Sequence, residues 1–265
     1  MFDYHVHTCY SQDADVPLSA QLDAAVRAGF KEICFTDHVD FDLIADGKPF
    51  YAPADLNALK EELKTIAPLY PSITVKRGAE VSFSDKRCAD AAKDYIKNAD
   101  LDFVIGSLHV IDGIDTYTHE FYVGKTKEQA YRLYLSTLAN VIRTNSYFCA
   151  MGHYDFVTKY APYPDRSLTY SFAPDLLDTI FTYLIQNGKT LELNTSAWLN
   201  GPNWGLDVYK RFSELGGEFV TVGSDAHRSS RVGARFDEAY ELLRAAGIRY
   251  VATYDKMKPT MHRIP

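Results

Sequence analysis

Short apolar runs alternate along the chain with longer segments of mixed polarity. Runs such as Ile33-Cys34-Phe35 and Phe103-Val104-Ile105 are hydrophobic on both faces, which is typical of strands enclosed in a parallel sheet. We predict strands near 2–6, 32–36, 73–79, 102–107, 148–152, 190–194, 219–223 and 249–254. The intervening segments repeat apolar residues at helical spacing, and they predict helices over 18–28, 54–67, 87–98, 127–144, 173–187, 205–215 and 236–246. Such alternation of strand and helix predicts an α/β fold.

The number of strand and helix units favours a barrel. The chain has 265 residues, close to the roughly 250 residues of a typical eight-unit α/β barrel. A doubly wound open sheet is the alternative, but such a sheet gathers its ligands at one switch point. Here polar residues follow almost every predicted strand. We therefore expect a single domain over residues 1–265, folded as a TIM-like barrel.

Composition excludes several classes of protein. A net charge of −7 with scattered lysines and arginines argues against a nucleic-acid partner, because phosphate backbones select basic surfaces. No apolar run has the length of a bilayer span, and a strand begins at residue 2, so we expect no membrane partner, no signal peptide and a cytoplasmic protein. The four widely spaced cysteines form no C-x-x-C pair and are expected to be free thiols. The sequence indicates no particular oligomeric state.

Histidines and carboxylates gather where the predicted strands end. In His5-Val6-His7 the two imidazoles lie on one face of a strand, about 6–7 Å apart, and both can reach one cation. The later strand ends carry Asp37, His38, Glu80, His109, His153, Asp155, Asn194, Asp225 and His227. Six of the eight histidines therefore lie at equivalent positions, where barrel enzymes assemble their chemistry.

This set of ligands exceeds what one cation can use. Zinc takes four ligands, and only three from the protein at a catalytic site, so the sequence predicts two or three metal ions with bridging carboxylates. Two such ions, about 3.5–4 Å apart, hold a shared hydroxide and stabilise an in-line displacement at phosphorus. The composition of the site therefore predicts a phosphoesterase.

In order along the chain, the motifs resemble those of the polymerase and histidinol phosphatase (PHP) superfamily. They are His5-x-His7, Thr36-Asp37-His38, the Glu80 strand, Ser107-x-His109, Gly152-His153-x-Asp155 and Ser224-Asp225-x-His227. The resemblance covers nearly the whole chain. It implies a distorted seven-stranded barrel of the (β/α)7 type. It also implies a trinuclear centre of zinc, iron or manganese.

The resemblance also implies which residues bind each metal. One metal would be held by His5, His7, Glu80 and Asp225, a second by Asp13, His38 and His227, and a third by Glu80, His109 and His153, with Glu80 as the bridge. Many relatives have histidine where this chain has Asp13. An aspartate is chemically adequate there, and its neighbour Asp15 is a rival ligand. Asp37, Asp155 and Asn194 are expected to lie behind the ligands and orient their imidazoles.

Within the superfamily, residues 107–138 and Leu191-Glu192-Leu193-Asn194-Thr195-Ser196 resemble the histidinol-phosphatase branch. This implies hydrolysis of L-histidinol phosphate, in histidine biosynthesis, by a metal-bridging hydroxide. Asp225, His38 and Glu80 would carry the catalysis.

At two positions where the histidinol-phosphatase branch usually has an arginine, this chain has other residues. Lys159 stands where an arginine is usual, and Trp198-Leu199 stands at a second arginine position. Lysine keeps the charge but lacks the bidentate fork of arginine. Further substrate-binding candidates are Arg166, Arg228, Arg231 and Trp198. Three other aromatic residues, Tyr117, Phe121 and Tyr122, either line the pocket or pack in the core.

Other functions remain as alternatives. A superfamily member acting on phosphotyrosine or another small phosphoester would share every ligand. The acidic charge disfavours a DNA-processing member, and an amidohydrolase would need a strand-four lysine, where this chain has His109. A non-catalytic binding module should lack several ligands, whereas this chain retains a full set.

Overall fold

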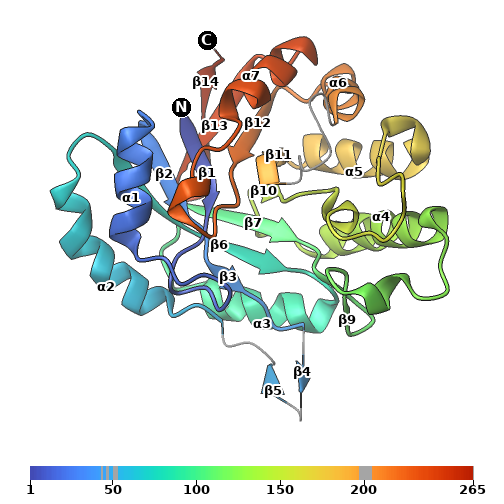
Figure 1. Ribbon diagram of the computed structural model, residues 1–265, viewed down its shortest axis with the longest axis horizontal. Helices are drawn as coiled ribbons and strands as arrows, with labels where there is room; N and C mark the ends of the chain where they lie inside the picture. Colours follow the sequence, from blue (N-terminus) through green and yellow to red (C-terminus); the bar gives the residue numbers. More distant parts are fainter. Residues whose placement is uncertain (43, 46–47, 50–52, 197–204, 265) are drawn as a thin grey trace.

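The computed structural model describes residues 1–42, 44–45, 48–49, 53–196 and 205–264. Its principal helices are α1 (Leu18–Arg27), α2 (Leu56–Ile66), α3 (Lys86–Ile96), α4 (Lys127–Thr144), α5 (Pro174–Gln186), α6 (Leu206–Glu214) and α7 (Phe236–Ala245). Its main sheet contains β1 (Phe2–Val6), β2 (Glu32–Phe35), β3 (His38–Val39), β6 (Thr74–Ser82), β7 (Phe103–Ser107), β10 (Ala150–Met151), β11 (Thr190–Asn194), β12 (Phe219–Gly223), β13 (Tyr250–Asp255) and β14 (Lys258–Arg263). The predicted α/β alternation is confirmed, and Figure 1 shows the helices around the outside of the strands.

The strands form one continuous sheet in the order β1-β2-β6-β7-β10-β11-β12-β13-β14. All pairs up to β13 are parallel. The end of β12 returns to β1, where the backbone N–H of Asp225 donates to the carbonyl of His5 (2.7 Å) and that of His7 donates to the carbonyl of Ala226 (3.1 Å). These bonds bring the first and the seventh parallel strand together, as the predicted seven-stranded arrangement requires.

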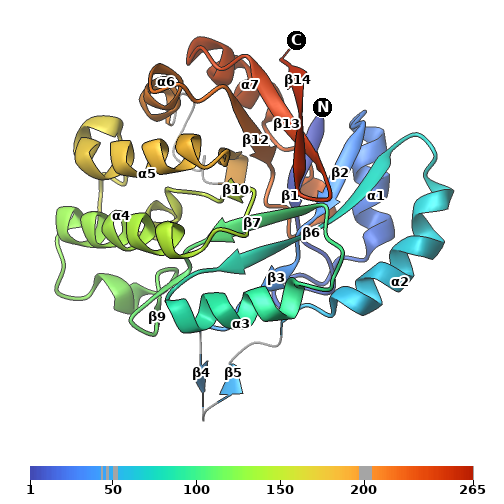
Figure 2. The same cartoon turned by 180° about the vertical axis from the view of Figure 1, so that it is seen from behind.

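Two features of the strands differ from the prediction. The strand expected to end at residue 79 continues to Ser82, because the short β3 pairs with its end and places His38 opposite Glu80. The last predicted strand, β13, turns back into an antiparallel hairpin with β14. The exposed, mostly polar residues of β14 give no apolar pattern from which a strand could be predicted. Figure 2 shows this hairpin beside the amino-terminal β1.

Two short hairpins were not predicted either. One is formed by β4 (Ile44–Ala45) and β5 (Lys48–Pro49), and the other by β8 (Val110–Ile111) and β9 (Ile114–Asp115). The first projects away from the body of the molecule in Figure 1. Two-residue strands leave too few positions for a period-2 pattern to be recognised.

The core has two parts on opposite sides of the sheet. A large cluster between the strands and the helices includes Ile33, Phe35 and Val104. A smaller cluster, which includes Tyr4 and Phe103, packs on the other face. Successive strand residues alternate between these faces, so the smaller cluster lies inside the ring of strands. In the described part of the chain, no helix is long and apolar enough to cross a membrane.

A β-bulge in β1 adjusts this alternation where the site begins. Asp3 pairs with Ile33 and Val6 pairs with Phe35, so β1 has an extra residue relative to β2 over this stretch. An extra residue lets neighbouring side chains point to the same face. Tyr4 therefore packs in the inner cluster, while the next residue, His5, also faces the interior and contacts Glu80.

Candidate metal centre

Glu80 lies at the centre of the histidine cluster and is buried. Its Oε2 is 3.2 Å from Nε2 of His5 and 3.3 Å from Nδ1 of His38. Its Oε1 is 2.7 Å from Nε2 of His153 and 3.3 Å from Nε2 of His109. Its Oε2 is also 3.5 Å from Nε2 of His7. One carboxylate on β6 thus contacts five imidazoles that come from four other parts of the chain. This is the arrangement required of a bridging ligand.

A first group of potential ligands consists of His5, His7 and Asp225. The two Nε2 atoms of the histidines are 3.1 Å apart, and Oδ1 of Asp225 is 3.3 Å from Nε2 of His7. Asp225 has a φ of 52°, in the left-handed region. Aspartate tolerates this conformation better than most residues, and strained backbone is common where a functional side chain must be aimed.

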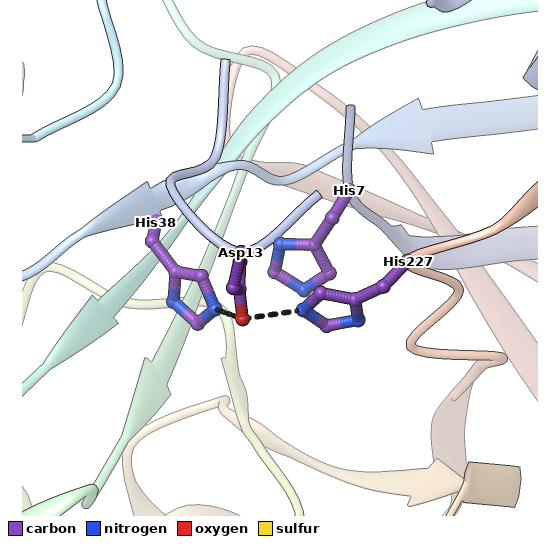
Figure 3. A group of neighbouring side chains, drawn as sticks. All are labelled: His7, Asp13, His38 and His227. Atoms are coloured by element: carbon purple, nitrogen blue, oxygen red, sulfur yellow. Dashed lines mark ion pairs between the residues drawn. The ribbon is translucent and has the colours of Figure 1, made fainter. Parts of the chain in front are cut away.

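A second group consists of His7, Asp13, His38 and His227, which Figure 3 shows converging on one point. Oδ2 of Asp13 is 2.9 Å from Nε2 of His227 and 3.6 Å from Nε2 of His38. Asp15 lines the neighbouring cavity but is absent from this group. The geometry therefore favours Asp13 over Asp15 as the carboxylate of this site.

The third group consists of His38, Glu80 and His109. His153 adjoins it, because its Nε2 is 3.4 Å from Nε2 of His109. Consequently, the structure brings together all nine residues that the resemblance implies as ligands. In each of the three groups, the ligand atoms lie within 4.8 Å of one another, so small side-chain shifts would bring them to bonds of about 2.0–2.2 Å with one cation.

The site strongly favours positive charge. Burial alone would raise the pKa of Glu80, but His5, His109 and His38 hold it well below its usual range. Burial opposes protonation of His109, yet the nearby Glu80 and Asp40 carboxylates raise its pKa to about 10. These imidazoles therefore hold protons when no other cation is present. A divalent cation would displace them, as metal binding to histidine requires.

His7 has the opposite electrostatic environment. Burial lowers its pKa to about 3, and the neighbouring imidazoles of His227 and His38 contribute to the shift. A neutral imidazole is the form that binds metals. His7 belongs to two of the three groups, which places an imidazole ready for coordination between them.

The principal orienting residue that sequence reasoning missed is Glu192. Its Oε1 is 2.6 Å from Nδ1 of His5, and its Oε2 accepts the backbone N–H of His153 at 2.9 Å. One signal was available, because a glutamate between two leucines of an apolar strand must be buried and needs a partner. The amide of the predicted residue Asn194 lies 3.3 Å from Glu192 Oε2 and from Asp225 Oδ2.

Asp37 is linked to the candidate ligand His7 through a third residue, Ser11. It accepts hydrogen bonds from the backbone and hydroxyl of Thr8 and from the hydroxyl of Ser11 (2.8 Å). The Ser11 hydroxyl lies 3.0 Å from Nδ1 of His7. Asp37 thus lies behind His7, as expected, and reaches its imidazole through the Ser11 hydroxyl rather than directly. Asp155 is buried and follows the candidate ligand His153 by two positions in the chain.

Asp40 was also missed. Its Oδ2 lies 3.1 Å from Nδ1 of His38 and 3.4 Å from Nδ1 of His109, and its Oδ1 accepts the backbone N–H of Ser82. Burial would raise its pKa, but His38 and His109 hold the pKa of Asp40 below its usual range. Asp40 follows His38 by two positions, the spacing at which strand residues share a face.

A cavity of about 980 Å³ opens beside the three groups. Among the expected substrate-binding residues, Lys159, Arg228 and Arg231 line it, whereas Arg166 instead donates to the carbonyl of Lys159 (2.9 Å). Trp198 lies outside the described residues. Nζ of Lys159 is 2.8 Å from Oδ2 of Asp225, so this ammonium group adjoins the first ligand group.

Of the aromatic candidates, Tyr117 lines the cavity, while Phe121 and Tyr122 are buried in the core. The hydroxyl of Tyr122 donates to the carbonyl of Val157 at 2.7 Å. This side chain therefore has a packing role in the core. Tyr160 was missed. It lines the cavity with its ring centroid 3.8 Å from that of Tyr117.

Comparison with known proteins gives consistent results. A model of the PHP domain family matches residues 3–196. The histidinol-phosphatase of Lactococcus lactis subsp. lactis (strain IL1403) is 32% identical over 97% of this chain and 95% of its own. The crystal structure of histidinol phosphate phosphatase from that organism, complexed with zinc, L-histidinol and phosphate, has a TM-score of 0.89 at 32% identity and covers 98% of both chains.

A second structure, from Listeria monocytogenes, is 18% identical and has a TM-score of 0.76, covering 89% of this chain and 99% of the other. At that identity it supports the fold alone. The family match includes the strands that carry His5, Glu80 and His153, and the Lactococcus relative extends the similarity across the remaining strands. The chain therefore belongs to the PHP domain family, in which it groups with the histidinol-phosphatases.

Proposed function

We propose that this protein uses bound divalent metal ions to hydrolyse a small phosphomonoester, and that L-histidinol phosphate is the substrate. The proposal depends chiefly on the contact of the Glu80 carboxylate with five imidazoles, around which three groups of potential ligands adjoin. The Lactococcus relative supports the choice of substrate, because the structure from that organism contains zinc, L-histidinol and phosphate.

We assign the ligands to three metals as the family resemblance implies. The first is held by His5, His7, Glu80 and Asp225, the second by Asp13, His38 and His227, and the third by Glu80, His109 and His153. The donor atoms fit this assignment, since imidazole nitrogens and carboxylate oxygens suit zinc, iron and manganese. Bound there, the metals supply an activated water and neutralise the phosphoryl oxygens.

The protein's own side chains would prepare the site for this chemistry. The two carboxylate oxygens of Asp225 have different partners. Its Oδ1 faces His7, and its Oδ2 accepts a hydrogen bond from Lys159. The ammonium group of Lys159 is therefore held at the cavity wall next to a metal ligand, where it can pair with a phosphoryl oxygen. Arg228 and Arg231 line the same cavity and add positive charge for the phosphate.

The direct test is phosphate release by the purified, metal-stripped protein after reloading with zinc, manganese or iron. L-Histidinol phosphate, phosphotyrosine and p-nitrophenyl phosphate should be compared under identical conditions. We expect the metal-free protein to be inactive and the reloaded protein to have its highest kcat/KM with L-histidinol phosphate. Higher kcat/KM with phosphotyrosine would refute the choice of substrate, and activity without any metal would refute the mechanism.

A pair of histidine variants separates the site from general effects. His109→Asn removes an imidazole that contacts Glu80. It should lower the metal content and reduce kcat by at least about 100-fold. His119→Asn is the matched control, because His119 is exposed and belongs to none of the three groups. Equal activity in the two variants would contradict the proposed site.

A further inference from the structure

Asp42 lines the same cavity as the candidate ligands but has no part in the groups described above. The residue is 7% exposed. Within the described part of the chain, its Oδ2 is buried without a hydrogen-bond partner. A carboxylate oxygen in this position is costly unless something complements its charge.

The surroundings of Asp42 compensate its charge only in part. Burial raises its pKa to about 6 and the charge of Asp40 adds to the shift, whereas the imidazole of His109 opposes it by a smaller amount. Among the described residues, no lysine or arginine forms an ion pair with Asp42, and the cavity's ammonium group, Lys159, is paired with Asp225. Asp115 also lines the cavity. This part of the cavity is therefore suited to a cation that the protein itself does not supply.

Side chains of both charges line the same cavity. The ligand groups, Lys159 and the arginines Arg228 and Arg231 suit an anion such as a phosphoryl group. Asp42 and Asp115 suit a cation. A substrate that carries both a phosphate and a positively charged nitrogen would match both kinds of side chain.

We propose that Asp42 is a specificity-determining residue that binds the cationic nitrogen of the substrate, either an ammonium or an imidazolium group. The inference rests on the proposed function, because it assumes a phosphomonoester bound at the metal centre. It goes beyond that function by naming the residue that distinguishes a cationic phosphomonoester from a neutral one. A charge-assisted hydrogen bond to the Asp42 carboxylate would complement its buried charge.

The test is the substrate dependence of Asp42→Asn, which keeps the shape of the side chain and removes its charge. Three substrates are compared in the metal-loaded protein: L-histidinol phosphate, its deamino analogue with the imidazole retained, and p-nitrophenyl phosphate. We expect kcat/KM for L-histidinol phosphate to fall by about 10- to 100-fold, mainly through KM. The value for p-nitrophenyl phosphate should change by less than about twofold, with metal content unaltered.

The deamino analogue identifies which nitrogen is bound. If the ammonium group is the ligand, the variant loses activity with L-histidinol phosphate alone, whereas an imidazolium ligand predicts an equal loss with the analogue. Asp90→Asn is the control, since it removes one carboxylate from an exposed pair with Lys86. No loss with either imidazole substrate, equal loss with all three substrates, or a loss of bound metal would each overturn the inference.

The proposed function is tested separately by the wild-type protein in the same assays. Wild-type hydrolysis of p-nitrophenyl phosphate without hydrolysis of L-histidinol phosphate would refute the proposed substrate. Phosphoethanolamine, compared with ethyl phosphate, would then test Asp42 as a receptor for an ammonium group. Equal effects of Asp42→Asn on this pair would refute the inference as well.

Discussion

Oε1 of Glu192 lies 2.6 Å from Nδ1 of His5, so a residue of β11 fixes the orientation of an imidazole supplied by β1. The other carboxylate oxygen accepts the backbone N–H of His153. Gly223 makes this approach possible, because a Cβ at that position would lie 2.3 Å from Cβ of His5 and 2.4 Å from Oε1 of Glu192. A single buried carboxylate thereby positions two of the candidate ligands.

Replacing Glu192 by glutamine should weaken metal binding while leaving the fold intact. The amide keeps the size of the side chain but loses the charge that orients His5, and loss of such partners lowers metal affinity by about 10- to 100-fold. The measurement is metal content after dialysis against graded concentrations of a chelator. Glu218→Gln, an exposed position, is the control, and unchanged affinity in Glu192→Gln would contradict the assigned role.

Replacement of Asp13 by alanine should cause the loss of one of the bound metal ions. Asp13→Ala removes the carboxylate that lies 2.9 Å from His227, and we expect it to lower the content by about one metal ion per chain, because two imidazoles alone make an incomplete site. Asp13→His should retain that metal. Elemental analysis decides the outcome, with Asp15→Ala expected to match the wild type. Loss of metal in Asp15→Ala but not in Asp13→Ala would reverse the assignment.

Lys159 should contribute to the binding of phosphate. Lys159→Ala removes the ammonium group beside Asp225, so we expect KM for the phosphomonoester and the inhibition constant of inorganic phosphate to rise by about tenfold. Lys159→Arg should restore or exceed wild-type affinity through its bidentate geometry. Steady-state kinetics with phosphate as inhibitor provides the measurement. Unaltered constants in Lys159→Ala would assign phosphate binding to other basic residues.

Metal binding should depend steeply on pH. The pKa of His109 is raised to about 10 in the metal-free protein, mainly by Glu80 and Asp40 against the effect of burial. Its imidazole is therefore protonated at neutral pH, and a metal must displace that proton. Affinity should rise by about tenfold per pH unit between pH 6 and 8 for each proton released, and should fall as the pH is lowered. Metal-buffered titrations at three pH values test this, and a flat profile would contradict it.

Much of the site could be predicted because the carboxyl ends of parallel strands meet at one edge. His5, Glu80, His153 and Asp225 are far apart in the sequence, yet each lies at or near the end of an apolar strand segment. The α/β alternation fixes the direction of those strands, so their ends converge whatever the details of packing. This is why eight of the nine candidate ligands can be predicted from strand ends, whereas Asp13 follows only from the family resemblance.

Residues behind and beside the ligands could not be predicted in the same way. Glu192 looks like an interior strand residue, and only the packing of β11 against β12, with β12 returning to β1, brings it to His5. Asp40 and Asp42 follow the predicted strand end, but their roles depend on which imidazoles and cavity walls face them. Ser11 likewise displaces Asp37 from direct contact with an imidazole.

The sequence by itself therefore determined the α/β fold and the set of chemically competent side chains, since strand periodicity and residue type are local properties. The tertiary structure decided which atoms approach one another. The choice of Asp13 over Asp15, the bulge that turns His5 inward, and the unpartnered oxygen of Asp42 all depend on contacts between segments far apart in the chain. Such contacts follow from side-chain packing in three dimensions, which no local pattern encodes.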